Sequence, residues 1–172
     1  KNRKKVETIG ELNEIDSYLI KINVVGYTYV GKTYLIQRYV TNEFRSNNNN
    51  QPTIHFEEYL KEFVVNDYQM RIVLRDTSLY CIRDGLIGMF FHNSNGFMMV
   101  FDLSDRESLD FVLDWYKSIK EKLGNKYIFI LIGNKCDLNE RITYEEANRI
   151  ASENGLPYFE ISVLKNKGVN EA

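Results

Sequence analysis

The sequence predicts an α/β fold in which helices cover both faces of a mostly parallel β-sheet. Strand-like and helix-like segments alternate along the chain, a pattern typical of parallel strands connected by helices. Two runs, residues 96–103 (GFMMVFDL) and 127–132 (YIFILI), are almost wholly apolar, as expected of strands that are buried on both faces. A long amphipathic segment lies between these two runs, where parallel strands need a connecting helix.

The first strand is expected at Ser17–Val25, where β-branched and apolar residues are mixed, and it ends at Gly26. We expect this strand to be largely buried. Apolar side chains then recur at helical spacing over Lys32–Val40, which predicts a helix. The polar stretch Thr41–Gln51 contains a run of asparagines and is expected to form a loop.

Two strand-like runs follow and are expected to form a hairpin. Phe56–Val65 and Tyr68–Asp76 are separated only by Asn66 and Asp67, a pair that suits a tight turn. The next segment, residues 83–92 (RDGLIGMFFH), has a weak helical pattern.

The clearest helix is expected over Ser104–Leu123. Ser104 followed by Glu107 matches a capping box, in which two side chains satisfy backbone N–H groups of the first turn. The apolar side chains of this segment fall on one stripe, which indicates a face packed on the sheet rather than a ligand site. The stripe comprises Leu109, Val112, Trp115, Tyr116, Ile119 and Leu123.

The remaining sequence continues the alternation. Tyr144–Asn154 is expected to be a helix that stops at Gly155, and residues 157–162 are expected to form the last strand. There is no internal repeat and no linker in the sequence. Residues 1–172 are therefore expected to form one domain, with residues 1–16 as an N-terminal extension.

Composition disfavours several functional classes. The formal net charge is -2, whereas a general nucleic-acid binder would carry a basic excess. The basic run at residues 1–5 is expected to be a solvated tail. Cys81 and Cys136 have neither metal-site spacing nor the number that a disulfide framework needs. No apolar run approaches the roughly 18 residues of a membrane span.

The loop after the first strand, residues 26–33 (GYTYVGKT), matches the pattern G-x-x-x-x-G-K-[ST]. A phosphate chain needs several backbone N–H donors at a helix N-terminus, whose dipole favours anions. Gly31 permits close approach of the backbone, Lys32 supplies a cation for the β- and γ-phosphates, and Thr33 offers a hydroxyl to Mg²⁺. A glycine-containing turn with an exposed lysine is the alternative, but the flanking strand and helix favour phosphate binding.

A second motif distinguishes the base. Asn134-Lys135-Cys136-Asp137 follows a buried strand, and the Asp137 carboxylate suits the N1–H and 2-amino donors of guanine. Adenine offers no such pair of donors, which disfavours an ATPase or a kinase. Asp76 ends another strand and suits a magnesium-orienting role through water, although a simple turn aspartate is the alternative.

Together these motifs resemble those of the Ras-like small GTPases. Four blocks, GYTYVGKT, PTI, RDTSL and NKCD, occur in the order and spacing of that family, and EISVL is similar to its E-T-S-A-K segment. The resemblance covers residues 20–172. The spacings from Thr53 to Asp76 and from Asp76 to Asp102 match the Rab branch, whereas the interval from Lys32 to Thr53 is longer at the asparagine run.

The resemblance implies a P-loop NTPase G domain, with a six-stranded, mostly parallel sheet that has one antiparallel edge strand. It also implies GTP or GDP as ligand and Mg²⁺ as cofactor, the metal being held by Thr33, Thr53 and, through water, Asp76. The nucleotide-binding residues that it implies are Gly26, Thr28, Tyr29, Val30, Gly31, Lys32, Thr33, Tyr34, Phe44, Thr53, Leu79, Asn134, Lys135, Asp137, Ser162, Val163 and Leu164.

The resemblance assigns particular roles around the base. Phe44 would pack an aromatic edge on the guanine, and Lys135 would lie along the other side. The backbone at Ser162 and Val163 would meet the base carbonyl. Leu164 replaces a lysine whose stem buttresses the base loop in the family, which would reduce affinity.

The chain departs from the family pattern where catalysis is expected. The family's D-T-A-G-Q segment is replaced by DTSLY at residues 76–80. Leu79 lacks the freedom of the family's hinge glycine, and Tyr80 replaces the glutamine that orients the attacking water. Lys32 is thus the retained catalytic residue, Tyr80 is expected to be ineffective, and hydrolysis is expected to be slow. Tyr29 occupies a small-residue position and would have to point outward.

Two functional hypotheses follow. The first is a Rab-like switch in vesicle traffic, a monomer that binds no nucleic acid and acts with effector, exchange-factor and GAP proteins. It would be cytoplasmic and peripheral on the cytosolic face of an endomembrane. A final helix and a lipidated tail, which anchors such proteins, would lie beyond Ala172. The second hypothesis is a nucleotide-binding pseudo-GTPase scaffold without turnover, in which nucleotide is bound permanently or poorly.

Overall fold

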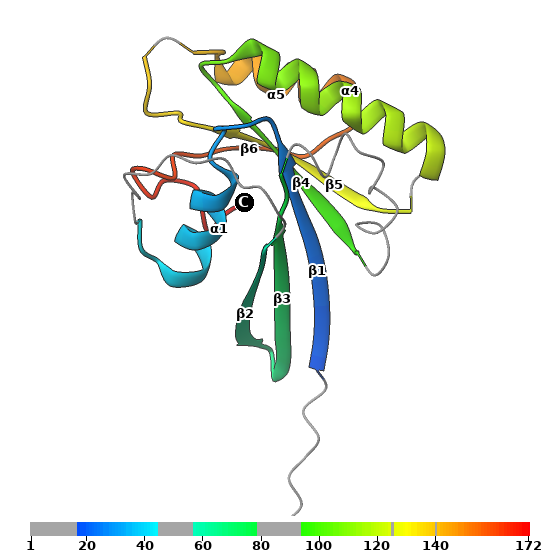
Figure 1. Cartoon of the computed structure of the whole chain (residues 1–172), viewed down its shortest axis with the longest axis vertical. Coiled ribbons are helices and arrows are strands. Elements are labelled where there is room, and N and C mark those ends of the chain that lie inside the picture. Colours follow the sequence, from blue (N-terminus) through cyan, green and yellow to red (C-terminus); the bar gives the residue numbers. More distant parts are fainter. Residues whose placement is uncertain (1–16, 45–56, 79–93, 125, 140) are drawn as a thin grey trace, which may run out of the picture.

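A computed structural model describes residues 17–44, 57–78, 94–124, 126–139 and 141–172 (Figure 1). The elements follow in the order β1 (Ser17–Gly26), α1 (Lys32–Thr41), β2 (Glu57–Val65), β3 (Tyr68–Asp76), β4 (Gly96–Asp102), α4 (Arg106–Leu123), β5 (Ile128–Asn134), α5 (Tyr144–Glu153) and β6 (Tyr158–Glu160). The weak helix expected at residues 83–92 and the extension at residues 1–16 lie outside the described residues.

The strands form one six-stranded sheet in the order β2-β3-β1-β4-β5-β6. Between the described strands only β2 runs antiparallel to its neighbour. The predicted fold class is therefore confirmed. The parallel strands end at one edge, where Val24 lies opposite Asp76, and Asp102 lies opposite Asn134. Ligands of such sheets bind outside this carboxyl edge.

The sheet separates two hydrophobic cores. Val24 of β1 belongs to the cluster that contains Leu35 and Ile36 of α1, whereas Val25 belongs to the cluster that contains Leu109 of α4. Successive side chains of a strand point to opposite faces. Helix α1 therefore covers one face of the sheet and α4 and α5 cover the other, as Figure 1 shows.

The expected hairpin is confirmed. Strands β2 and β3 pair in register from Val65 with Tyr68 to Glu57 with Asp76. Asn66 and Asp67 both have positive φ, 47° and 66°. Two consecutive left-handed residues are what a type I′ turn requires, and asparagine and aspartate tolerate that conformation better than other residues with a side chain.

Strand β1 differs from the expectation of a largely buried strand, because its first residues are exposed. Tyr18 and Leu19 retain about half of their accessible surface, at 50% and 49%. The pairing of β1 with β4 begins only at Ile22, whereas its pairing with β3 begins at Ser17. The first residues of β1 therefore have a neighbouring strand on one side only, and they extend beyond the core (Figure 1).

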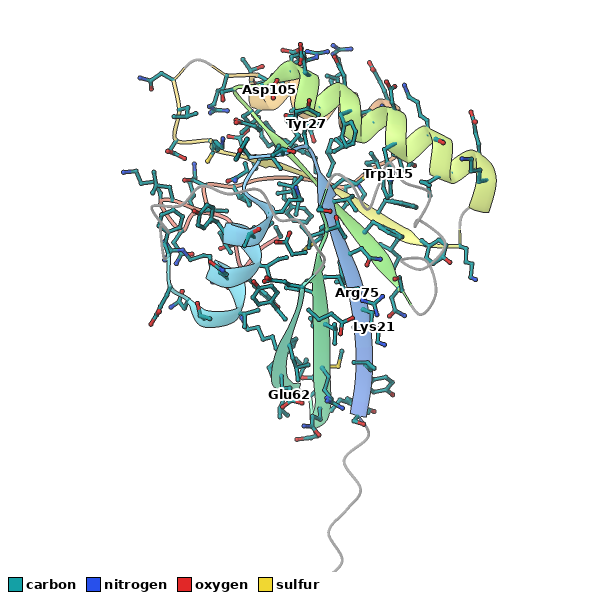
Figure 2. The ribbon with its side chains drawn as sticks, viewed as in Figure 1. Lys21, Tyr27, Glu62, Arg75, Asp105 and Trp115 are labelled. Atoms are coloured by element: carbon teal, nitrogen blue, oxygen red, sulfur yellow. The ribbon has the colours of Figure 1, made fainter. Side chains whose placement is uncertain are left out.

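The expected capping box at Ser104 is wrong. Asp105 is the N-cap of α4, and its carboxylate accepts the backbone N–H of Glu107 at 3.0 Å (Figure 2). The Ser104 hydroxyl instead donates to Oδ1 of Asp102 at 2.7 Å. Both residue types favour N-caps, and the helix begins one residue later because the strand-end carboxylate binds the serine.

The last strand is shorter than expected. Strand β6 pairs with β5 only from Tyr158 to Glu160. Ser162 then pairs with Lys167 in an isolated bridge, so the residues between them form a closed loop. This base loop, Ser162–Lys167, contributes to the candidate site described next.

Candidate functional site

The loop between β1 and α1 is pressed against its neighbours at two glycines. A Cβ atom on Gly26 would lie 2.1 Å from the carbonyl oxygen of Val100 in β4. Gly31 has φ 99°, and a Cβ atom there would lie 2.5 Å from Nδ2 of Asn134. Only glycine, which has no Cβ atom, therefore fits at either position. The phosphate loop, residues 26–33, thus lies directly on the ends of β4 and β5.

Lys32 begins α1 and is held inside this loop. Its ammonium group donates to the carbonyl oxygens of Gly26 at 3.1 Å and Tyr27 at 2.9 Å. The side chain is 8% exposed. Burial lowers the pKa of Lys32 to about 8, with the carboxylate of Asp76 acting in the opposite direction. A buried cation thus lies where a phosphate chain would bind.

The two tyrosines of the loop leave its interior. Tyr29 has φ 65° and is 64% exposed, so its ring faces solvent as the sequence required. The ring of Tyr27 packs edge-on against Phe111 of α4, with centroids 5.4 Å apart (Figure 2). Neither ring therefore blocks the backbone N–H groups of the loop. Asn134 donates from Nδ2 to the carbonyl oxygen of Val30 at 2.8 Å and fixes the middle of the loop.

Two oxygen-bearing side chains meet beside Lys32 and fit a magnesium ion. The hydroxyl of Thr33 donates to Oδ2 of Asp76, which is fully buried at the end of β3. Hydroxyl and carboxylate oxygens are ligands that Mg²⁺ accepts, usually with phosphate and water completing its shell. Among the described residues no three His, Cys, Asp or Glu side chains cluster as a metal cage. Thr53, the other expected ligand, lies outside the described residues.

The base end of the site is joined to the phosphate loop by Asn134. This buried side chain accepts the backbone N–H of Val163 at 3.2 Å while it donates to Val30. Oδ1 of Asp137 accepts the hydroxyl of Ser162 at 2.5 Å. That hydroxyl oxygen also accepts the backbone N–H of Lys165 at 3.0 Å. The aspartate expected to read guanine is therefore fixed by the base loop.

Val163 and Lys135, which were both expected to contact the base, make contacts with other protein residues. The N–H of Val163 donates to Oδ1 of Asn134 rather than pointing to the place where a base would bind. Lys135 has φ 68°, and its ammonium lies 2.5 Å from Oδ2 of Asp102. The ammonium of Lys135 is thus taken by Asp102, and only the aliphatic part of its side chain could lie along a base.

Phe44 packs on Tyr34, with ring centroids 5.2 Å apart. Leu79 and Tyr80 lie outside the described residues.

Sequence reasoning missed two residues of this region, Asp102 and Arg38. Asp102 holds Lys135 and accepts both the N–H and the hydroxyl of Ser104, at 2.9 and 2.7 Å. The sequence does single out Asp102, because a carboxylate directly after the apolar run of β4 needs hydrogen-bonding partners. Arg38 contacts the base loop from α1, and a single arginine in an ordinary helix gives no such signal.

The sequence model that describes the Ras family matches residues 21–172, which are most of the chain. The chain belongs to the Ras family. Among curated relatives of this Ras-family chain, "Ras-related protein Rab-4" of Dictyostelium discoideum is 31% identical over 90% of the chain and 75% of the relative. "Ras-related protein Rab-21" of Homo sapiens is 29% identical over 90% of the chain and 69% of the relative. "Ras-related protein RABA4d" of Arabidopsis thaliana is 28% identical over 95% and 73%.

These findings confirm the resemblance to Ras-like small GTPases and to the Rab branch in particular. In this Ras-family chain, the matched region includes both the phosphate loop and the N-K-x-D segment. The family is one of guanine-nucleotide-binding proteins, and the geometry above places its two recognition segments on the same edge of the sheet.

Proposed function

We propose that the chain is a Rab-like switch that binds GDP and GTP with Mg²⁺, acts in vesicle traffic and hydrolyses GTP slowly. The observation that carries the proposal is the bridge through Asn134. This side chain joins the phosphate loop at Val30 to the base loop at Val163. One buried amide therefore sets the distance between the two ends of a nucleotide pocket.

The phosphate end offers a cation and backbone donors. Gly31 is the N-cap of α1 and has no side chain to cap the N–H groups of the first turn. Those groups and the helix dipole attract an anion, and the ammonium of Lys32 adds a full charge. When bound, magnesium would neutralise charge on the β- and γ-phosphates. Thr33 and, through water, Asp76 would hold it, with Thr53 joining in the triphosphate state.

The base end distinguishes guanine from adenine. The Asp137 carboxylate, held by Ser162, retains lone pairs for the N1–H and the 2-amino group of guanine. Adenine has no donor at either of these positions, and a buried acceptor without its donor costs free energy. We therefore propose strong preference for guanine nucleotides.

Slow turnover is proposed from the residues that follow β3. Leu79 stands where the family has a hinge glycine, and Tyr80 where it has the glutamine that orients water. A phenol has neither the length nor the paired donor and acceptor of a glutamine amide. Nucleotide binding is retained in this proposal, because Lys32, Thr33 and Asp137 are all present.

Sequence similarity to Rab-named proteins supports a proposal for the cellular location and the partners. We propose a monomer, peripheral on the cytosolic face of an endomembrane, that acts with effector, exchange-factor and GAP proteins. A lipidated tail beyond residue 172 would provide the anchor. No helix in the described ranges is long and apolar enough to cross a bilayer.

Single-turnover GTP hydrolysis tests the proposed impairment. We expect the wild type to hydrolyse GTP more slowly than about 10⁻⁴ per second, below the intrinsic rate of an intact small GTPase. Tyr80→Gln should accelerate the reaction, because it restores an amide that can orient water. Tyr144→Gln, which changes an exposed tyrosine of α5, is the matched control and should leave the rate unchanged.

Two outcomes decide between the functional hypotheses. A wild-type rate typical of the family would contradict the impairment. Nucleotide extracted from the purified protein gives the second readout. Bound GTP or GDP that exchanges with added nucleotide supports the switch. Nucleotide that does not exchange, or protein that is purified without nucleotide and does not bind GDP in titration, would favour the scaffold.

A further inference from the structure

Arg38, in the last turn of α1, contacts two segments that surround the base end of the site. Its Nε donates to the carbonyl oxygen of Val163 at 3.2 Å, and Nη2 lies 3.5 Å from the carbonyl oxygen of Leu164. Its guanidinium carbon lies 5.3 Å from the ring centroid of Phe44. The base loop and the Phe44 segment are thus held by one side chain.

The geometry suits arginine in particular. A guanidinium is planar, so it donates N–H groups along its edge while its face lies on an aromatic ring. A lysine ammonium is a compact point charge, and it cannot maintain both contacts with the same spacing. The ring of Tyr34 also packs on Phe44, with the two planes tilted by 40°.

A second contact fastens the end of α1 to the same loop. Nη1 of Arg38 donates to the carbonyl oxygen of Asn42 at 3.3 Å. Asn42 caps the helix with φ 58°, and its N–H donates to the carbonyl oxygen of Arg38 at 2.9 Å. Its side-chain oxygen accepts Nδ2 of Asn166 at 3.4 Å. Arg38 and Asn42 therefore hold both halves of the base loop.

The contacts of the loop lead on to the guanine-reading carboxylate. Val163, held by Arg38, follows directly on Ser162, whose hydroxyl donates to Asp137 at 2.5 Å. A displacement of the loop would move this hydroxyl and release the carboxylate. Phe44 would lose its cationic neighbour in the same event.

We propose that Arg38 is a positioning residue for guanine recognition. It holds the base loop so that Ser162 fixes Asp137, and it holds Phe44 at the side of the base. The inference rests on the proposed function, because it assigns a role within the guanine nucleotide pocket. Arg38 touches the protein and not the nucleotide, so its effect is transmitted through the loop.

The test compares GDP with inosine diphosphate, which lacks the 2-amino group of guanine. Affinities for both are measured by titration in Mg²⁺, with thermal melts of the nucleotide-free protein. Arg38→Ala should weaken GDP binding about tenfold and narrow the preference for GDP over inosine diphosphate about threefold or more, because a loosened Asp137 reads the amino group poorly. Arg38→Lys should fall between the wild type and Arg38→Ala.

Arg149→Ala is the matched control. Arg149 pairs with Glu153 on the exposed surface of α5, and its removal should change neither affinity. If Arg38→Ala does not fold, the preference measured for Arg38→Lys decides, and a narrowed ratio is again expected.

Each outcome has one meaning. An unchanged ratio of GDP to inosine diphosphate affinity, whether or not the melting temperature falls, would overturn the role of Arg38 and leave the proposed pocket intact. A wild type that binds neither nucleotide would overturn the proposed function and this inference with it.

Discussion

At the scale of single residues, Lys32 sets the charge of the phosphate loop. Its ammonium is bound by two carbonyl oxygens and is nearly removed from water, and this burial lowers its pKa to about 8. A bound phosphate chain would favour the charged form and raise that pKa. Above pH 8, nucleotide binding therefore takes up a proton.

We predict that GDP affinity falls as the pH rises above about 8, by up to about tenfold per pH unit. Titrations with GDP in Mg²⁺ at about pH 7, 8 and 9 measure this. Lys32→Met lacks the titrating group and should bind weakly with no such fall. An affinity that is constant across this range in the wild type would contradict the burial of a titrating cation.

The same pKa has the opposite consequence for the protein without nucleotide. Between pH 8 and 10.5, the ordinary pKa of lysine, the unfolded chain holds more protons at Lys32 than the native protein does. The contribution of Lys32 to the free energy of unfolding therefore rises with pH in this window.

Tyr29 stores backbone strain in the phosphate loop. Its φ of 65° is a left-handed conformation that costs a residue with a Cβ atom about 1–2 kcal/mol. We predict that Tyr29→Gly increases the free energy of unfolding by about 0.5–1 kcal/mol, after the entropy that glycine adds to the unfolded chain. Urea unfolding of nucleotide-free protein measures it. Tyr29→Ala keeps the strain and should show no gain; an equal gain would show that the ring, not the backbone, is responsible.

The residues that could be predicted are those whose chemistry is local in sequence. The glycines, lysine and threonine of residues 26–33 act within one loop, and Asp137 lies in a compact tetrapeptide. Asp102 and Arg38 act on residues 33 and 125 positions away in the chain. The sequence around Asp102 indicates that its carboxylate needs a partner but not which one, and the sequence around Arg38 indicates no partner. Only the folded structure could assign both.

At the scale of elements, the phosphate loop is positioned by the strand ends below it. Gly31 approaches Asn134 at the end of β5, and Gly26 approaches Val100 in β4. The loop thus depends on close packing between segments, and the bond from Asn134 to Val30 needs the same close approach.

We predict that Gly31→Ala weakens GDP binding at least about tenfold. The added Cβ atom would lie 2.5 Å from Nδ2 of Asn134, so the amide must move and lose a buried hydrogen bond, which costs about 1–3 kcal/mol. Titration with GDP measures the effect.

Gly124→Ala is the control for the backbone alone. Gly124 also has a positive φ, 64°, although its ψ of -148° differs from that of Gly31, and a Cβ atom there meets nothing within 4 Å. This variant should lose about 1–3 kcal/mol of stability and bind GDP as the wild type does. Equal binding by Gly31→Ala would contradict the close packing of the loop.

Element boundaries show what the sequence leaves open. Ser104 and Asp105 are both good N-cap residues, so local propensity cannot choose between them. The choice is made by Asp102, which takes the serine hydroxyl. Likewise the exposed start of β1 depends on where β4 begins to pair, and the apolar pattern of β1 carries no information about the length of its neighbour.

At the scale of the whole molecule, the candidate site lies where both cores meet the edge of the sheet. Val24 and Val25 of β1 belong to different cores and directly precede the loop. The fold class was predictable because strand-like and helix-like segments alternate along the chain, and because continuous apolar runs indicate strands that are buried on both faces. The assembly of β3, β4 and β5 ends into one site follows from the same parallel order.

The most direct test is a calorimetric titration of nucleotide-free protein with GDP and with ADP, both in Mg²⁺. The account predicts that GDP binds and that ADP binds at least about a thousandfold more weakly, because only guanine has donors for the Asp137 carboxylate. Asp137→Asn should prefer xanthosine diphosphate, whose base has a carbonyl where guanine has its amino group. Equal or tighter binding of ADP, or no binding of GDP, would contradict a guanine nucleotide pocket.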